Sequence, residues 1–211
     1  MGALDQITTT LALTMGLAWA SGINLYAALL TLGYLANTGN IELPPDLQIV
    51  ANPLVMTAAG LMYAIEFFAD KVPGVDTGWD TLHTFIRIPA GAMLAAGAVG
   101  DLNPAVEVAA AIVGGGLAAG SHATKAGTRV LINTSPEPFT NWAASIGEDI
   151  AVIGGVWACL NHPLVFLIAL IFFIALMIWL LPRIWQGIKK VLRFIFNLFN
   201  PKRNSNTPEV Q

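Results

Sequence analysis

Two short stretches of this sequence repeat one pattern of ionisable side chains in otherwise apolar surroundings. Each stretch places three such residues at positions i, i+3 and i+7: Asp80, His83 and Arg87 in one, and His122, Lys125 and Arg129 in the other. Residues at these spacings share one face of an α-helix. Charged side chains are costly inside a bilayer, and where they occur they mark binding sites, ion pathways or proton relays. The two stretches therefore predict two helices that turn charged faces toward a common polar site.

Carboxylates on neighbouring apolar segments could complete this site. We expect a cavity in which basic residues bind an anionic solute or a lipid headgroup: Arg87, His122, Lys125 and Arg129. A second set would couple protons or balance the charge: Glu66, Asp80, His83, Glu148 and Asp149. The alternative is structural, with pairs such as Glu66–Arg87 and Glu148–Lys125 neutralising each other between helices. Residues near segment ends, above all Asp70, Lys71 and Arg129, could instead reach the membrane interface. No spacing suggests a metal site, and we expect no cofactor.

The elements that must position these residues are transmembrane helices. Of the 211 residues, 55% are hydrophobic and only 11% are charged, whereas soluble domains carry roughly 25% charged residues. The run from Pro163 to Leu181 has no charged or polar side chain, and its length matches the roughly 20 residues that cross a bilayer as a helix. The predicted fold is all-α and polytopic, with membrane lipids as partners and no nucleic acid.

Polar turns divide the chain into six apolar segments, at 11–36, 53–69, 80–99, 104–132, 139–157 and 164–181. We expect a membrane domain over 1–182, an amphipathic interfacial helix over 183–200 and a disordered tail over 201–211. Basic residues are concentrated after Pro182, so the positive-inside rule puts the C-terminus in the cytoplasm. Six full spans would put the N-terminus there as well.

The two halves of the membrane domain carry a weak internal repeat. At an offset of 100 residues, Gly16-Leu17-Ala18 matches Gly116-Leu117-Ala118, which predicts one copy over about 5–100 and a second over 104–182. The first helix of each copy contains residues that favour a break: Ser21, Gly22 and Asn24 in one, and Gly120 and Ser121 in the other. If both helices span the membrane, the copies are inverted, as in many secondary transporters. If both are re-entrant, four segments cross and the copies are parallel.

Several motifs point to a known family. They are Ser21-Gly22-Ile23-Asn24-Leu25-Tyr26, Glu66-x3-Asp70-Lys71, Trp79-Asp80-x2-His83-x3-Arg87 and Lys125-Ala-Gly-Thr-Arg129. In these residues the chain resembles a bacterial integral membrane family of unknown function, DUF4126, over about residues 10–160. The resemblance implies a multi-pass protein of the bacterial cytoplasmic (inner) membrane and carries over no activity.

The charges within apolar segments favour a membrane transport protein, whether transporter, flippase or channel, with a charged intramembrane site that is proton-coupled. Two alternatives stay open. One is a membrane-embedded enzyme acting on a lipid, with His83 or His122 as acid or base. The other is a structural or assembly protein without transport activity. A homo-oligomer also stays open as a partner prediction.

Overall fold

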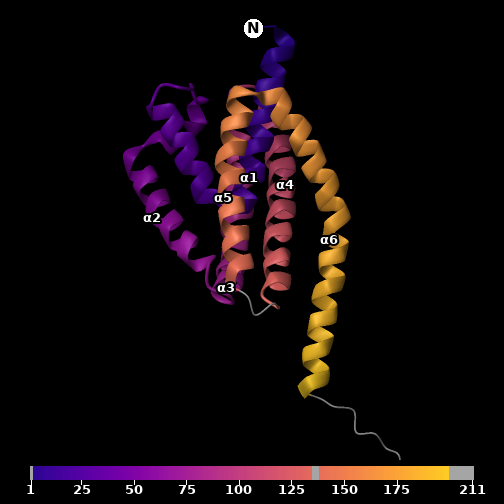
Figure 1. Ribbon diagram of the computed structural model, residues 1–211. Coiled ribbons are helices and arrows are strands. Elements are labelled where there is room, and N and C mark those ends of the chain that lie inside the picture. Colours follow the sequence, from indigo (N-terminus) through magenta and orange to yellow (C-terminus); the bar gives the residue numbers. More distant parts are fainter. Residues whose placement is uncertain (1, 135–137, 200–211) are drawn as a thin grey trace, which may run out of the picture.

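The first helix, α1 (Ala3–Asn37), lies at the centre of an all-helical fold (Figure 1). The computed structural model describes residues 2–134 and 138–199. Around α1 stand the short 3₁₀-helix η1 (Pro45–Ala51) and the helices α2 (Pro53–Ala69), α3 (Val75–Gly97), α4 (Pro104–Ile132), α5 (Pro138–Asn161) and α6 (Pro163–Phe199). Most of α1 from Ala12 to Ala28 is buried, so this helix is the core on which the others pack.

The chain of α1 reverses direction at Asn24, whose backbone is not helical (φ −146°, ψ 95°). The first turns of α1 line a cavity together with Val99 and Val106. The segment that follows α1 reaches the same place, because Leu47 packs beside Gly97 and Asp46 beside Gly100. Both ends of α1 therefore lie at the turn between α3 and α4. The two halves of α1 thus form a hairpin, and a hairpin is the shape expected of the re-entrant arrangement, one of the two that the sequence leaves open.

Local chemistry explains why, among the predicted break residues Ser21, Gly22 and Asn24, the reversal occurs at Asn24. The Asn24 side chain accepts a hydrogen bond from the Ala27 amide (3.0 Å), which caps the returning half of α1 in the manner of an N-cap residue. Gly22 instead lets the helix approach α4 closely, since a Cβ there would collide with Ser121 Oγ and the Ala118 carbonyl. Ser21 donates to the Arg87 carbonyl (2.8 Å) and so holds the tip against α3.

The predicted break at Gly120 and Ser121 is wrong, because α4 is one uninterrupted helix from Pro104 to Ile132. Ser121 Oγ donates to the Leu117 carbonyl one turn earlier (3.0 Å), a bond that a helix accommodates. At Gly120 the missing side chain makes room for Met177 of α6. Because α1 reverses and α4 does not, the two segments that the internal repeat equates differ in shape. The repeat halves stay a prediction.

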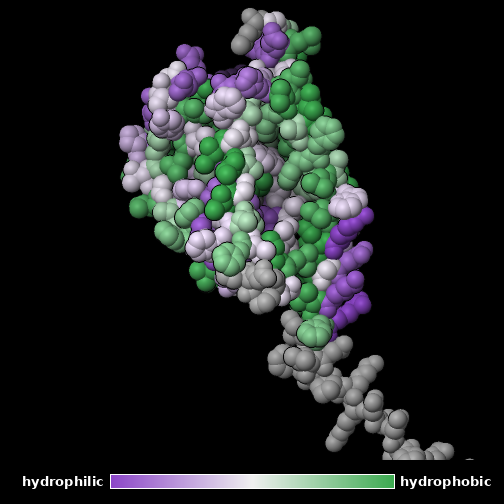
Figure 2. Space-filling model, in the orientation of Figure 1, coloured by the Kyte–Doolittle hydropathy of each residue, from purple (hydrophilic) through white to green (hydrophobic). Residues whose placement is uncertain are grey.

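The predicted interfacial helix over 183–200 is not separate from the last apolar segment. Helix α6 continues through Pro182 to Phe199, and it extends beyond the other helices (Figure 1). A proline removes bonds to preceding carbonyls, and here the Arg183 guanidinium donates to the Trp179 carbonyl (2.5 Å). Ile184 packs against Gly127 of α4. Figure 2 shows polar side chains gathered along one side of this lower part of α6. The predicted tail over 201–211 lies outside the described residues.

Four helices are long and apolar enough to cross a membrane, namely α1, α4, α5 and α6 over the described residues. A fifth candidate is the pair of η1 and α2, bent by 62°. The remaining segment, α3, is 23 residues long but carries buried Asp76, Asp80 and Arg87. It packs extensively against α4, where Gly91 meets Ala118 and Gly114 meets Ala95. Such small-residue contacts are typical of helices within membranes. The fold is that of a multi-pass membrane protein.

Candidate functional site

Seven ionisable side chains from α2 to α5 meet inside the bundle and form what we term the ionic cluster. Its members are Glu66, Asp70, Asp80, Arg87, Lys125, Arg129 and Glu148. All are buried except Glu148, whose side chain is 19% exposed. The sequence-predicted basic residues and carboxylates are thus brought together from four helices. Asp70 and Arg129 belong to the cluster and do not reach outward, so the expectation that they lie at the interface is wrong.

Arg87 joins α3 to α2. Its guanidinium lies 2.5 Å from Glu66 Oε1 through Nη2 and 2.9 Å from Asp80 Oδ1 through Nη1. Arg87 and Glu66 both have fully buried side chains. An ion pair in such surroundings is stable only as long as both partners are present, because a lone buried charge is strongly destabilising.

Lys125 is the centre of the cluster. Its Nζ lies 2.9 Å from Asp70 Oδ2 and 3.2 Å from Glu66 Oε1, with Asp80 and Glu148 at 3.7 and 3.5 Å. Arg129 extends the cluster by pairing with Glu148 Oε2 (2.7 Å), and it also donates to the Asn141 carbonyl of α5 (3.0 Å). Both pairs that the sequence suggested, Glu66–Arg87 and Glu148–Lys125, are present.

The reversal of α1 meets this cluster directly. Lys125 Nζ donates to the Ile23 carbonyl (3.1 Å), at the end of the first half of α1. Asp149 accepts from Asn24 Nδ2 (2.9 Å) and from the Tyr63 hydroxyl (3.1 Å), at the start of the returning half. The C-terminal end of a helix carries partial negative charge and the N-terminal end partial positive charge. Each half-helix end therefore faces a side chain of complementary charge.

The two histidines of the predicted site have different partners. His122 Nδ1 is 3.2 Å from Arg87 Nη1, and since arginine has only donors, Nδ1 must accept. His122 Nε2 lies 2.8 Å from Thr84 Oγ1. His83 bonds to the Trp79 carbonyl through Nδ1 (2.9 Å) and to the Tyr26 hydroxyl through Nε2 (3.0 Å). Both imidazoles are thus committed to protein partners.

Carboxylate is in excess within the ionic cluster. Three cations face four carboxylates, so with every group ionised the cluster carries 3 − 4 = −1. One oxygen on each of Glu66, Asp70 and Asp80 (Oε2, Oδ1 and Oδ2) is buried without a hydrogen-bond partner. Buried polar atoms are normally satisfied, so the described part of the chain leaves the hydrogen bonding of these three carboxylates incomplete. Among the described residues, no group of three or more His, Cys, Asp or Glu side chains could hold a metal ion.

Some partners of the ionic cluster were not among the predicted site residues. Asp76 is buried at the start of α3 and accepts two bonds from Asn133 Nδ2 (2.8 and 3.0 Å), and Asn141 bonds in turn to Asn133 (2.7 Å). This polar chain links the ends of α3, α4 and α5 beside Arg129. Single asparagines in loops carry no distinctive signal. Asp70 lies four residues after Glu66 in the same motif, and this i, i+4 spacing was the sequence signal that it shares the helix face of Glu66.

Comparison with known proteins identifies a family. The family described as "Domain of unknown function (DUF4126)" matches residues 11–183, which contain every member of the ionic cluster and the whole reversal of α1. No curated protein and no solved structure matches the chain.

Proposed function

We propose a function from the geometry alone, because the chain belongs to the DUF4126 family, which is described only as a domain of unknown function. The protein is a membrane transport protein, and the ionic cluster is the site at which an anion and protons bind together. The observation that carries this proposal is the reversal of α1 at the cluster. In secondary transporters, interrupted helices bring their half-helix ends to the substrate and ion sites near the bilayer midplane.

The charge balance of the ionic cluster couples anion binding to proton uptake. With all groups ionised the cluster is net negative and repels an anion. Uptake of two protons by its carboxylates changes the sum to −1 + 2 = +1, which attracts one. The proposal is supported by the three carboxylate oxygens of Glu66, Asp70 and Asp80 that have no hydrogen-bond partner among the described residues. Protonation would also release Arg87, Lys125 and Arg129 from their present partners, so proton uptake and anion binding favour each other.

The orientation of the chain in the membrane follows from the basic residues of α6. Arg183, Lys189, Lys190 and Arg193 all lie on the lower part of α6, which the positive-inside rule assigns to the cytoplasm. The protein then resides in the bacterial inner membrane with its C-terminus inside. Because α1 is re-entrant, its N-terminus and the segment around η1 lie at the outer face, and α2 to α6 run from face to face.

The experiment is a flux measurement on the full chain in liposomes that contain a pH-sensitive dye. External sulfate, nitrate or inorganic phosphate is added, and acidification of the lumen is followed. We expect at least one anion to bring protons in, and we expect the Lys125→Met variant to abolish this. Lys190→Gln, which removes an exposed lysine of α6, should retain it. Equal acidification with the Lys125 variant, or none above protein-free liposomes for any anion, would refute the proposal.

A structural role is the second candidate, and the pairing of each of the three cations with a carboxylate favours it. In that case the cluster only joins α2, α3, α4 and α5, and no variant of it changes a flux. The geometry gives no support to a lipid-cleaving enzyme, since both ring nitrogens of His83 and His122 are bonded within the protein.

A further inference from the structure

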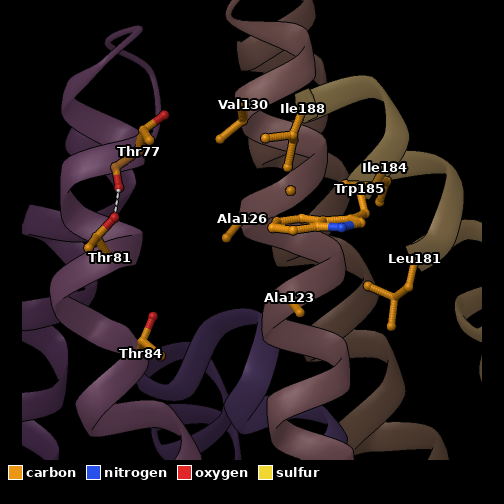
Figure 3. A pocket seen from close by; sticks show the side chains of 11 residues that line it. Thr77, Thr81, Thr84, Ala123, Ala126, Val130, Leu181, Ile184, Trp185 and Ile188 are labelled. Atoms are coloured by element: carbon orange, nitrogen blue, oxygen red, sulfur yellow. Dashed lines mark hydrogen bonds between the residues drawn. The ribbon is translucent and has the colours of Figure 1, made fainter. Parts of the chain in front are cut away.

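Helices α3, α4 and α6 line a groove (Figure 3). Its residue Thr84 is bonded to His122, which in turn lies 3.2 Å from Arg87 of the ionic cluster. The volume of the groove is about 350 Å³. Helix α6 contributes Leu181, Ile184, Trp185 and Ile188, and α4 contributes Ala123, Ala126, Gly127 and Val130. The Trp185 indole extends from α6 toward Ala126. Two of the three walls of this groove are therefore apolar.

The third wall has three threonines, but their hydroxyl protons are already used. Thr81 donates to the Thr77 carbonyl (2.7 Å) and Thr84 to the Asp80 carbonyl (3.1 Å). Thr77 donates to Asp76 Oδ1 (3.3 Å) and accepts from Asn133 (2.9 Å). The threonine wall thus offers no free hydroxyl donor, which suits a hydrocarbon chain better than an anion.

The two ends of the groove differ in their surroundings. Thr77 lies level with Ile188 at one end, and Thr84 lies level with Leu181 at the other (Figure 3). Beyond the Ile188 end, α6 carries two consecutive lysines, Lys189 and Lys190, and Lys189 Nζ lies 5.2 Å from the centre of the Trp185 ring. The Leu181 end lies deeper, at Thr84, which touches His122. A phospholipid has the same arrangement, with its headgroup at the interface and its chain directed toward the midplane.

We propose that this groove binds one anionic phospholipid, with an acyl chain along Trp185 and the phosphate beside Lys189. The charge complementarity at Lys189 selects an anionic headgroup, and the absence of free donors along the threonine wall selects a chain. The site requires only that the helices cross a membrane. It is independent of the proposed transport activity.

The test is native mass spectrometry of the full chain in detergent with equal amounts of phosphatidylglycerol and phosphatidylcholine. We expect one retained phosphatidylglycerol per chain. Ala126→Phe fills the groove and should remove it, whereas Ala109→Phe, on an exposed position of α4 outside the groove, should not. Lys189→Gln should reduce the preference for the anionic lipid about fivefold, and Lys190→Gln should reduce it less.

A second measurement does not depend on the folding of the Ala126 variant. Phosphatidylglycerol with brominated chains should quench part of the tryptophan fluorescence, and Trp185→Phe should remove the quenched part. The proposal is overturned if Ala126→Phe and the wild type retain lipid equally and Trp185→Phe leaves quenching unchanged. It is also overturned if no lipid is retained and Ala126→Phe instead converts a dimer to a monomer, since a second copy would then occupy the groove.

Discussion

The Glu66–Arg87 pair offers the sharpest test of the ionic cluster, because both side chains are fully buried and 2.5 Å apart. Arg87→Met leaves Glu66 and Asp80 with Lys125 as their cation, at 3.2 and 3.7 Å. The net charge of the cluster falls from −1 to −2. Loss of one partner from a buried pair costs about 3–5 kcal/mol. We therefore expect this variant to be strongly destabilised.

The compensating variant is Glu66→Gln combined with Arg87→Met. It contains two cations and three carboxylates, so its net charge returns to 2 − 3 = −1. Replacing both members of a buried pair is often neutral, and we expect the double variant to recover more than half of the stability that Arg87→Met loses. Glu66→Gln alone removes excess negative charge and should cost less than Arg87→Met.

The assay is thermal unfolding in detergent, followed by the fluorescence of the six tryptophans. A loss of 3–5 kcal/mol corresponds to a Tm about 6–20 °C lower for a chain of this size. If the effects of the two single substitutions simply add in the double variant, the residues are not coupled. That outcome would refute the description of Arg87 and Glu66 as a buried pair.

Further predictions concern the tip of α1. Gly22→Ala should destabilise the protein by about 1–3 kcal/mol through overpacking, because its Cβ meets Ser121 and the Ala118 carbonyl. The control is Gly116→Ala in α4, where the space around the glycine is open; it should be neutral or stabilise by up to about 1 kcal/mol. The same melting assay compares the two variants, and equal effects would contradict the close approach of α1 to α4. Asn24→Ala should cost about 1–2 kcal/mol through loss of the cap, and Asn24→Asp should cost more, since it places a second carboxylate 2.9 Å from Asp149. A more stable Asn24→Asp variant would contradict this geometry.

How much of the ionic cluster the sequence predicts depends on whether the signal is the charge of a residue or its position along a segment. The convergence of the charged residues was predictable, because buried charges in a membrane protein must find one another. Their pairing as Glu66–Arg87 followed from charge and proximity of segments. The burial of Arg129 and Asp70 was not predictable, since a position near a helix end is compatible with both an interfacial and an internal side chain. Only the packing of α5 over α4 decides it.

The helix breaks show the same limit. Ser21-Gly22 and Gly120-Ser121 look alike in sequence, yet only the first lies next to a break. The difference comes from tertiary partners, because Asn24 can cap the returning helix and also bond to Asp149. Ser121 has its own helix carbonyl within reach. Pro182 likewise predicted a boundary, but packing of Ile184 on Gly127 keeps α6 continuous.

The most direct test of the account is the sidedness of α1, because the tip of α1 places one half-helix end at Lys125 of the ionic cluster and the other at Asp149. In a Cys159→Ala background, single cysteines replace Leu4, Glu42 or Val72, all exposed, and intact cells are labelled with a membrane-impermeant thiol reagent. We predict that the Leu4 and Glu42 positions label and the Val72 position does not. Labelling of Glu42 without Leu4 would mean that α1 crosses the membrane, and the proposed site would lose its central feature.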